Sequence, residues 1–151
     1  MEKLPDDVYN FFHKQHCVIV STIDPSGRPH SSCKGIVQIN KNGQVYLIDL
    51  YDGRTFSNLK RNPHLAVTAV DEHRFKGFCL KGKAVLSKAN ELSAHIITAW
   101  ENKIVQRITQ RVVKNISGDK GHPHHPEFLL PKPKYMIVMQ IEEIVDLTPR
   151  L

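Results

Sequence analysis

The sequence predicts a mainly β protein in which an antiparallel barrel is accompanied by one long helix in the C-terminal half. Strand-like apolar runs are closed by short turns between residues 17 and 86, and no strand–helix–strand pattern repeats. Both observations favour antiparallel over parallel pairing. From about residue 88 to residue 115 the hydrophobic period becomes helical. Residues 1–151 are expected to form a single domain, since a chain of this length buries roughly 70% of its unfolded surface around one core.

The first elements are predicted to be a short helix and then strands. Residues 5–14 are typical of a helix that begins at Pro5, carries acidic residues in its first turn and directs Val8, Phe11 and Phe12 inward. Four or five strands are expected between residues 17 and 86. Asp-Pro-Ser-Gly at 24–27 is a β-turn, because proline presets φ and glycine closes the turn. Residues 40–43 are a hairpin turn.

The C-terminal half is predicted to contain the long helix, a loop at 117–133 and a final strand at 135–141. One face of the helix is apolar and the opposite face is charged, which indicates a stripe that covers the core or a dimer contact. The stripe consists of Leu92, Ile96, Ile97, Trp100, Ile104, Ile108 and Val112.

Residues 54–63, Arg-Thr-Phe-Ser-Asn-Leu-Lys-Arg-Asn-Pro, contain a candidate anion site. They follow a strand-like run and a turn, so Arg54 and Thr55 fall in the first turn of a short helix. Unpaired backbone N–H groups attract anions there, and a guanidinium matches phosphate oxygens. Pro63 ends the helix. The alternative is a surface pair between Arg54 and an acid such as Asp52.

Three segments in this order resemble the FMN-binding split β-barrel family, the fold of pyridoxamine 5'-phosphate oxidase and its small relatives. They are Gly-Arg-Pro-His-Ser-Ser at 27–32, the segment at 54–63, and Phe-Cys-Leu-Lys-Gly-Lys-Ala at 78–84. The resemblance covers residues 9–87 and the last strand. It implies a six-stranded antiparallel split (Greek-key) barrel that binds FMN in a groove between the two subunits of a homodimer.

The resemblance also implies how the flavin phosphate is held. Arg54 and Thr55 would contact the phosphate, and Asn58 would brace the helix one turn further on.

The ring end of the flavin is implied to lie along two strands. Ile48 and Asp49 would present strand backbone to the ribityl chain or the ring edge. Ser32, Cys33 and Lys34 would lie along the isoalloxazine, where N–H groups and a positive charge stabilise negative charge on the ring. Strand alternation could instead turn Lys34 to solvent.

Two functions from different classes fit these residues. The first is an FMN-dependent oxidoreductase acting on an unknown small substrate, with catalytic residues unassigned. The second is a non-enzymatic flavin- or haem-binding carrier or sensor, and a deazaflavin would also suit a basic phosphate site. True pyridoxamine 5'-phosphate oxidases carry a C-terminal Arg-x-His segment, whereas residues 147–151 read Leu-Thr-Pro-Arg-Leu. Vitamin B6 oxidation is therefore not expected.

The net charge of +6 indicates an anionic partner, and a phosphorylated small molecule is sufficient. Basic residues are scattered except for Lys103, Arg107 and Arg111, which lie one turn apart and are interpreted as a solvated helix face. The sequence contains no run of basic residues with interleaved aromatic residues, so it does not indicate nucleic-acid binding. The longest apolar run is shorter than the roughly 18 residues that span a bilayer, so no membrane contact is expected.

A cytoplasmic location is expected. The first residues lack the apolar core of a signal peptide, and three cysteines without a C-x-x-C pair are typical of a reducing compartment. Cys17, Cys33 and Cys79 are interpreted as small buried apolar residues, although the resemblance places Cys33 beside the flavin.

A histidine-rich loop is the second place where chemistry could lie. His122, His124 and His125 could meet a metal. Flanking prolines splay the chain, and Glu127 is a weak fourth ligand. A solvated or substrate-adjacent loop is therefore favoured, and no metal is expected.

Overall fold

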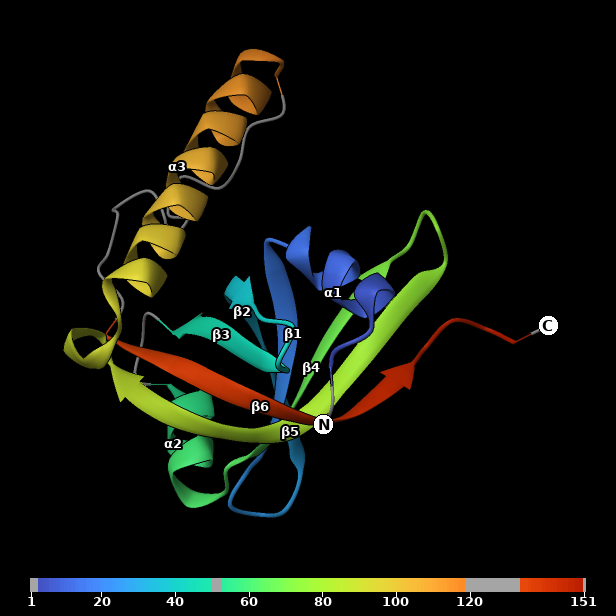
Figure 1. The fold of residues 1–151 in the computed structure, drawn as a ribbon, viewed down its shortest axis with the longest axis vertical. Helices are drawn as coiled ribbons and strands as arrows, with labels where there is room; N and C mark the ends of the chain where they lie inside the picture. The colour runs from blue at the N-terminus through green and yellow to red at the C-terminus, as the bar shows by residue number, and fades with distance from the viewer. Residues whose placement is uncertain (1–2, 50–52, 119–133, 151) are drawn as a thin grey trace.

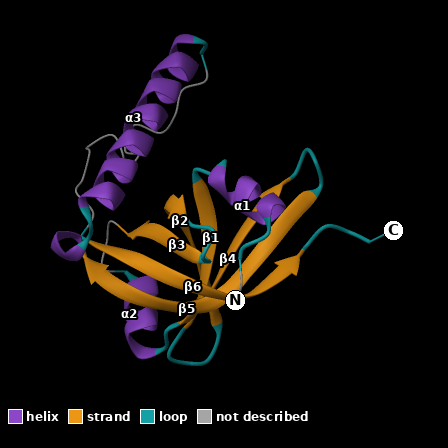
Figure 2. Ribbon diagram, in the orientation of Figure 1, coloured by secondary structure: helices purple, strands orange, loops and turns teal. Residues whose placement is uncertain are grey.

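The computed structural model describes residues 3–49, 53–118 and 134–150. Its strands form a closed antiparallel barrel with the order β1-β2-β3-β6-β5-β4, which confirms the predicted mainly β fold with a six-stranded barrel (Figures 1 and 2). The strands are β1 (Cys17–Ile23), β2 (Pro29–Ile39), β3 (Gln44–Asp49), β4 (His64–Asp71), β5 (Lys76–Lys88) and β6 (Tyr135–Asp146). The helices are α1 (Asp6–His13), α2 (Arg54–Arg61) and α3 (Ala94–Ile116), and a 3-10 turn, η1 (Ala89–Glu91), precedes α3.

Two glycine turns join the first three strands where the sequence predicts them. Gly27 has a φ of 77° and donates its N–H to the carbonyl of Asp24 at 3.0 Å. Gly43 has a φ of 83° and donates to Asn40 at the same distance. Glycine adopts this left-handed backbone without a steric penalty.

Short helices cover the two ends of the barrel, and α1 and α2 lie on opposite sides of it (Figure 1). Val8, Phe11 and Phe12 of α1 are buried, as predicted, and the Phe11 ring meets Phe78 of β5 edge-on at 5.2 Å. At the other end, Leu59 of α2 is 4% exposed and belongs to the same core cluster. The alternating inward residues of the strands fill the space between, as the strand period of two requires.

The long helix α3 packs against the outside of the barrel and extends away from it (Figure 1). It begins at Ala94 rather than near residue 88, because β5 continues to Lys88 and η1 follows. Its buried residues form a second apolar cluster with strands β2, β3 and β6. The cluster contains Val37, Ile48, Ile96, Trp100, Ile104 and Met136.

The predicted apolar stripe is only partly correct. Ile97 is 38% exposed, because it lies about 100° around the helix from Ile96. Val105 and Val113 are also exposed. The side chains of Ile108 and Val112 are outside the described part of the structure.

Strand β6 continues to Asp146, beyond the predicted end at residue 141. Glu142 and Glu143 face outward on this extension, where they pair with Lys83 at 3.6 Å and Lys81 at 3.3 Å on β5. Charged residues therefore interrupt the apolar pattern but not the strand. Within the described ranges, no helix is long and apolar enough to cross a membrane.

Candidate functional site

A buried carboxylate lies at the end of the barrel that α2 covers. Asp49 is 1% exposed, and its Oδ1 lies 2.9 Å from the ammonium of Lys34. The hydroxyl of Tyr135 donates to its Oδ2 at 2.6 Å. These residues come from β2, β3 and β6, which are neighbours in the barrel. Because Asp49 pairs with Tyr135 and Ile48 with Gly35, strand register brings all three side chains together.

Two further polar contacts fasten α2 to the barrel. The hydroxyls of Ser32 and Thr55 are 2.8 Å apart, and either can donate. The amide of Asn58 donates to the hydroxyl of Thr22 on β1 at 3.0 Å. Thr22, Thr55 and Asn58 are each at most 3% exposed. Hydrogen bonds between buried groups hold the orientation of the helix, since breaking one leaves a buried polar atom without its partner.

The first turn of α2 is suited to an anion. Arg54 is exposed there, and the residue before it, Gly53, provides no side-chain cap. No acidic residue lies in this turn. Backbone N–H groups at the helix start therefore keep their attraction for a negative ligand. Asp52, the alternative partner of Arg54, lies outside the described residues.

The structure brings most of the predicted cofactor residues to this end of the barrel. Ser32 contacts Thr55 and Lys34 contacts Asp49, while Asn58 contacts Thr22. Alternation turns Lys34 toward the buried carboxylate rather than to solvent, and its side chain is 15% exposed.

Two other predicted residues point elsewhere. Cys33 is exposed on the face of β2 opposite to the face that carries Ser32 and Lys34. Ile48 packs its side chain under α3. The assignment of these residues to a flavin stays a prediction.

Sequence reasoning missed the partners Tyr135 and Thr22. The alternation of inward and outward residues along β3 signals that a partner is needed. Asp49 has the same parity as the core residues Val45 and Leu47, which places its carboxylate on the inner face where a partner is required. Tyr135 pairs directly with it across β3 and β6, but that register is not visible in a single sequence.

The interpretation of the basic row on α3 as a solvated face is wrong for the side chains that are described. Lys103 donates to the carbonyl of Ile36 at 2.9 Å, and Arg107 donates to the carbonyl of His16. Burial, with a smaller contribution from the charge of Arg107, lowers the pKa of Lys103 to about 8. The two side chains pack α3 onto the strands because Gly35 leaves room for a guanidinium.

The interpretation of all three cysteines as buried is also wrong. Cys17 and Cys33 are exposed and Cys79 is half-buried. Partial burial, followed by hydrogen bonding to Cys17, raises the pKa of the Cys33 thiol. The thiol form of Cys33 is therefore favoured over the thiolate.

No group of three metal-ligating side chains occurs among the residues that the structure describes. His122, His124 and His125 lie outside those residues, so the histidine loop is not tested.

Residues 4–130 match the sequence profile of the family described as pyridoxamine 5'-phosphate oxidase. The chain belongs to this family. No curated protein sequence matches it.

Solved structures share the fold of this family member. HupZ of Group A Streptococcus is 18% identical, with a TM-score of 0.64 over 96% of this chain and 94% of that chain. HutZ of Vibrio cholerae, named as a heme storage protein, is 19% identical, with a TM-score of 0.54 over 95% and 94%. An F420 reductase is 12% identical, with a TM-score of 0.57 over 94% and 98%. At these identities the likeness concerns the fold alone.

Proposed function

We propose that the protein is an FMN-dependent oxidoreductase that acts on a small substrate, with the flavin phosphate at the start of α2. One observation carries the proposal: Arg54 is exposed in the first turn of a helix that has neither a side-chain cap nor an acidic residue there. Membership in the pyridoxamine 5'-phosphate oxidase family supports a flavin as the anion.

The residues around α2 divide into binding and positioning roles. Arg54 binds the phosphate together with the N–H groups of the first turn. Thr55 and Asn58 are positioning residues, since their hydrogen bonds to Ser32 and Thr22 hold the helix against the barrel. FMN, when bound, would supply the hydride or electron transfer, and these residues would hold and orient it.

A homodimer is part of the proposal. Ile97, Val105 and Val113 expose apolar side chains on α3, and a two-fold pair is the commonest way to cover such a surface. Sedimentation of the flavin-loaded protein should show a species of twice the 17.2 kDa chain mass. A 17.2 kDa species alone, with flavin bound, contradicts the dimer.

Titration of the apo-protein with FMN and with riboflavin tests the phosphate site. Riboflavin lacks the phosphate, so it reports ring binding alone. Arg54→Ala should weaken FMN binding about ten- to a hundredfold, as expected for losing a charge-assisted contact, and leave riboflavin binding unchanged. Arg74→Ala is the matched control, because Arg74 is exposed in the turn between β4 and β5, at the α1 end of the barrel. Equal FMN affinity for Arg54→Ala and the wild type overturns the assignment.

A second titration separates the enzyme from a carrier. The likeness to HutZ makes haem the competing ligand, and the likeness to an F420 reductase adds a deazaflavin. The proposal expects FMN to bind most tightly and a nicotinamide nucleotide to bleach its colour. Tighter haem binding, or a flavin that no reductant bleaches, favours the carrier.

A further inference from the structure

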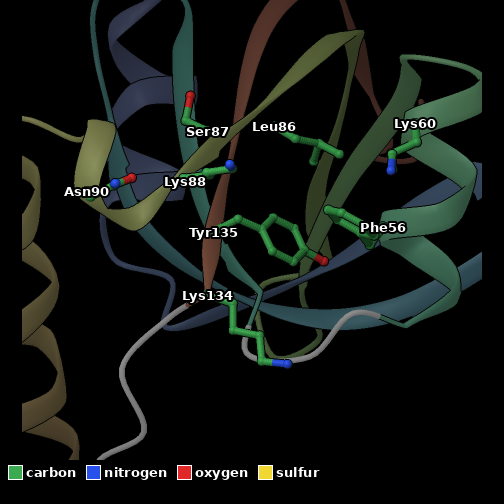
Figure 3. Close-up of a pocket in the computed structure, with 8 residues that line it drawn as sticks. All are labelled: Phe56, Lys60, Leu86, Ser87, Lys88, Asn90, Lys134 and Tyr135. Atoms are coloured by element: carbon green, nitrogen blue, oxygen red, sulfur yellow. The ribbon is translucent and has the colours of Figure 1, made fainter.

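A cleft opens along the side of α2 that carries Phe56 and Lys60, between the helix, the end of β5 and the start of β6 (Figure 3). Its volume is about 670 Å³, which lies within the range of small-molecule sites. Phe56, Leu86 and Tyr135 provide its apolar surface.

The aromatic part of this cleft is held in place. The rings of Phe56 and Tyr135 have centroids 4.4 Å apart and planes tilted by 50°. Tyr135 is 4% exposed, and its hydroxyl is bound to the buried Asp49. The Phe56 ring is therefore held by a buried ring, and a flat ligand that packs on it would not need to order it.

Three lysines from three separate segments of the chain surround the apolar surface. Lys60 comes from α2, Lys88 from the end of β5 and Lys134 from the residue before β6. In Figure 3, Lys60 and Lys88 lie on opposite sides of the hollow. The Lys60 ammonium lies 5.3 Å from the centroid of the Phe56 ring.

The charged residues described in the cleft lining are all lysines, and the carboxylate of Glu91 lies nearby, where it accepts a hydrogen bond from the backbone N–H of Lys88 at 3.1 Å. None of the lining residues that the structure describes is acidic. Among the described residues, neither Lys60 nor Lys88 has a carboxylate within ion-pair distance. Convergent cations beside a low-dielectric surface create a positive potential, which favours an anion.

We propose that this cleft binds a small organic anion with a planar aromatic body, an aromatic carboxylate or phosphate, at a site separate from that of the flavin. The flat body packs on the half-buried Phe56 ring, which the buried Tyr135 ring supports from behind, and the acid group meets the lysines. Lys60 is six residues beyond Arg54, about 9 Å along the helix axis. Phe56 faces Tyr135 of β6 whereas Thr55 faces Ser32 of β2, so the two sites use different sides of α2.

Calorimetric titration of the FMN-loaded protein with 2-naphthoate tests the site, with 2-naphthalenemethanol as the uncharged analogue. Naphthoate should bind with saturation and more tightly than the alcohol. Inorganic phosphate should bind weakly, since it lacks the aromatic body. Naphthoate should leave the flavin in place; release of FMN overturns the separation of the two sites.

Three variants locate the binding. Lys60→Gln and Lys88→Gln should each weaken naphthoate about two- to fivefold, as expected for one partly screened charge. Phe56→Leu should weaken naphthoate and the alcohol alike, because it removes the flat surface. Lys83→Gln is the control, since Lys83 is exposed on β5 outside the cleft and pairs with Glu142. All these lysines are exposed, so the variants should fold. Equal binding of naphthoate and the alcohol, equal effects of the control, or no saturable binding overturns the proposal.

Discussion

Replacement of Asp49 should destabilise the barrel more than any surface charge change. The carboxylate is 1% exposed and is bound by the Lys34 ammonium and the Tyr135 hydroxyl. Asp49→Ala removes the acceptor of two poorly exposed donors. The Lys34 side chain is 15% exposed, and Tyr135 is 4% exposed. Removing one partner of a buried pair costs about 3–5 kcal/mol of unfolding free energy.

A double-mutant cycle isolates the pair. Lys34→Met alone leaves the buried Asp49 carboxylate without its ammonium partner. In the Asp49→Ala background the same substitution removes the ammonium that has lost its carboxylate. The double variant should therefore cost less than the sum of the two single variants by at least about 2 kcal/mol. The pair Lys83–Glu142, whose side chains are 54% and 52% exposed, provides the control cycle, with an expected coupling below about 1 kcal/mol.

Urea unfolding followed by far-UV circular dichroism measures these free energies. All variants must be compared at one protein concentration, because association shifts apparent stability. Additive single effects, or a cost of Asp49→Ala below about 1 kcal/mol, would refute a stabilising buried network. Tyr135→Phe should cost about 1.5–3 kcal/mol, as expected for one hydrogen bond to a charged acceptor.

Three further predictions concern packing and pH. Gly82→Ala should cost more than about 3 kcal/mol in urea unfolding, because its Cβ would lie 2.0 Å from a backbone oxygen of β6; Gly53→Ala, whose Cβ meets nothing within 4 Å, is the control. Ile104→Ala should cost about 2–4 kcal/mol through a cavity under α3, and an effect below 1 kcal/mol would contradict its 7% exposure. Burial, then the charge of Arg107, lowers the pKa of Lys103 from 10.5 to about 8. The folded state then binds fewer protons than the unfolded state between these values, so the contribution of Lys103 to stability should rise from pH 8 to pH 10.5. A side-chain NMR titration assigned with Lys103→Arg checks this, and a midpoint above 10 contradicts it.

Much of the fold could be predicted because its signals are local. The turns at residues 24–27 and 40–43 depend on a few neighbouring residues, and the inward face of α1 follows from helical spacing. The limits of β6 were missed because Glu142 and Glu143 interrupt the apolar pattern while pairing with lysines of β5. That compensation comes from a strand distant in sequence.

The candidate site divides in the same way. The sequence alone determined that Arg54 and Thr55 occupy the first turn of a short helix after a strand, because the residues next to a helix end determine where the helix begins and ends. Only the tertiary structure decided that Lys34, Asp49 and Tyr135 meet inside the barrel, and that lysines from three separate segments surround one cleft. The physical reason is register: a shift of one residue in any strand would turn these side chains to the opposite face, and the register is set by contacts between strands far apart in the chain.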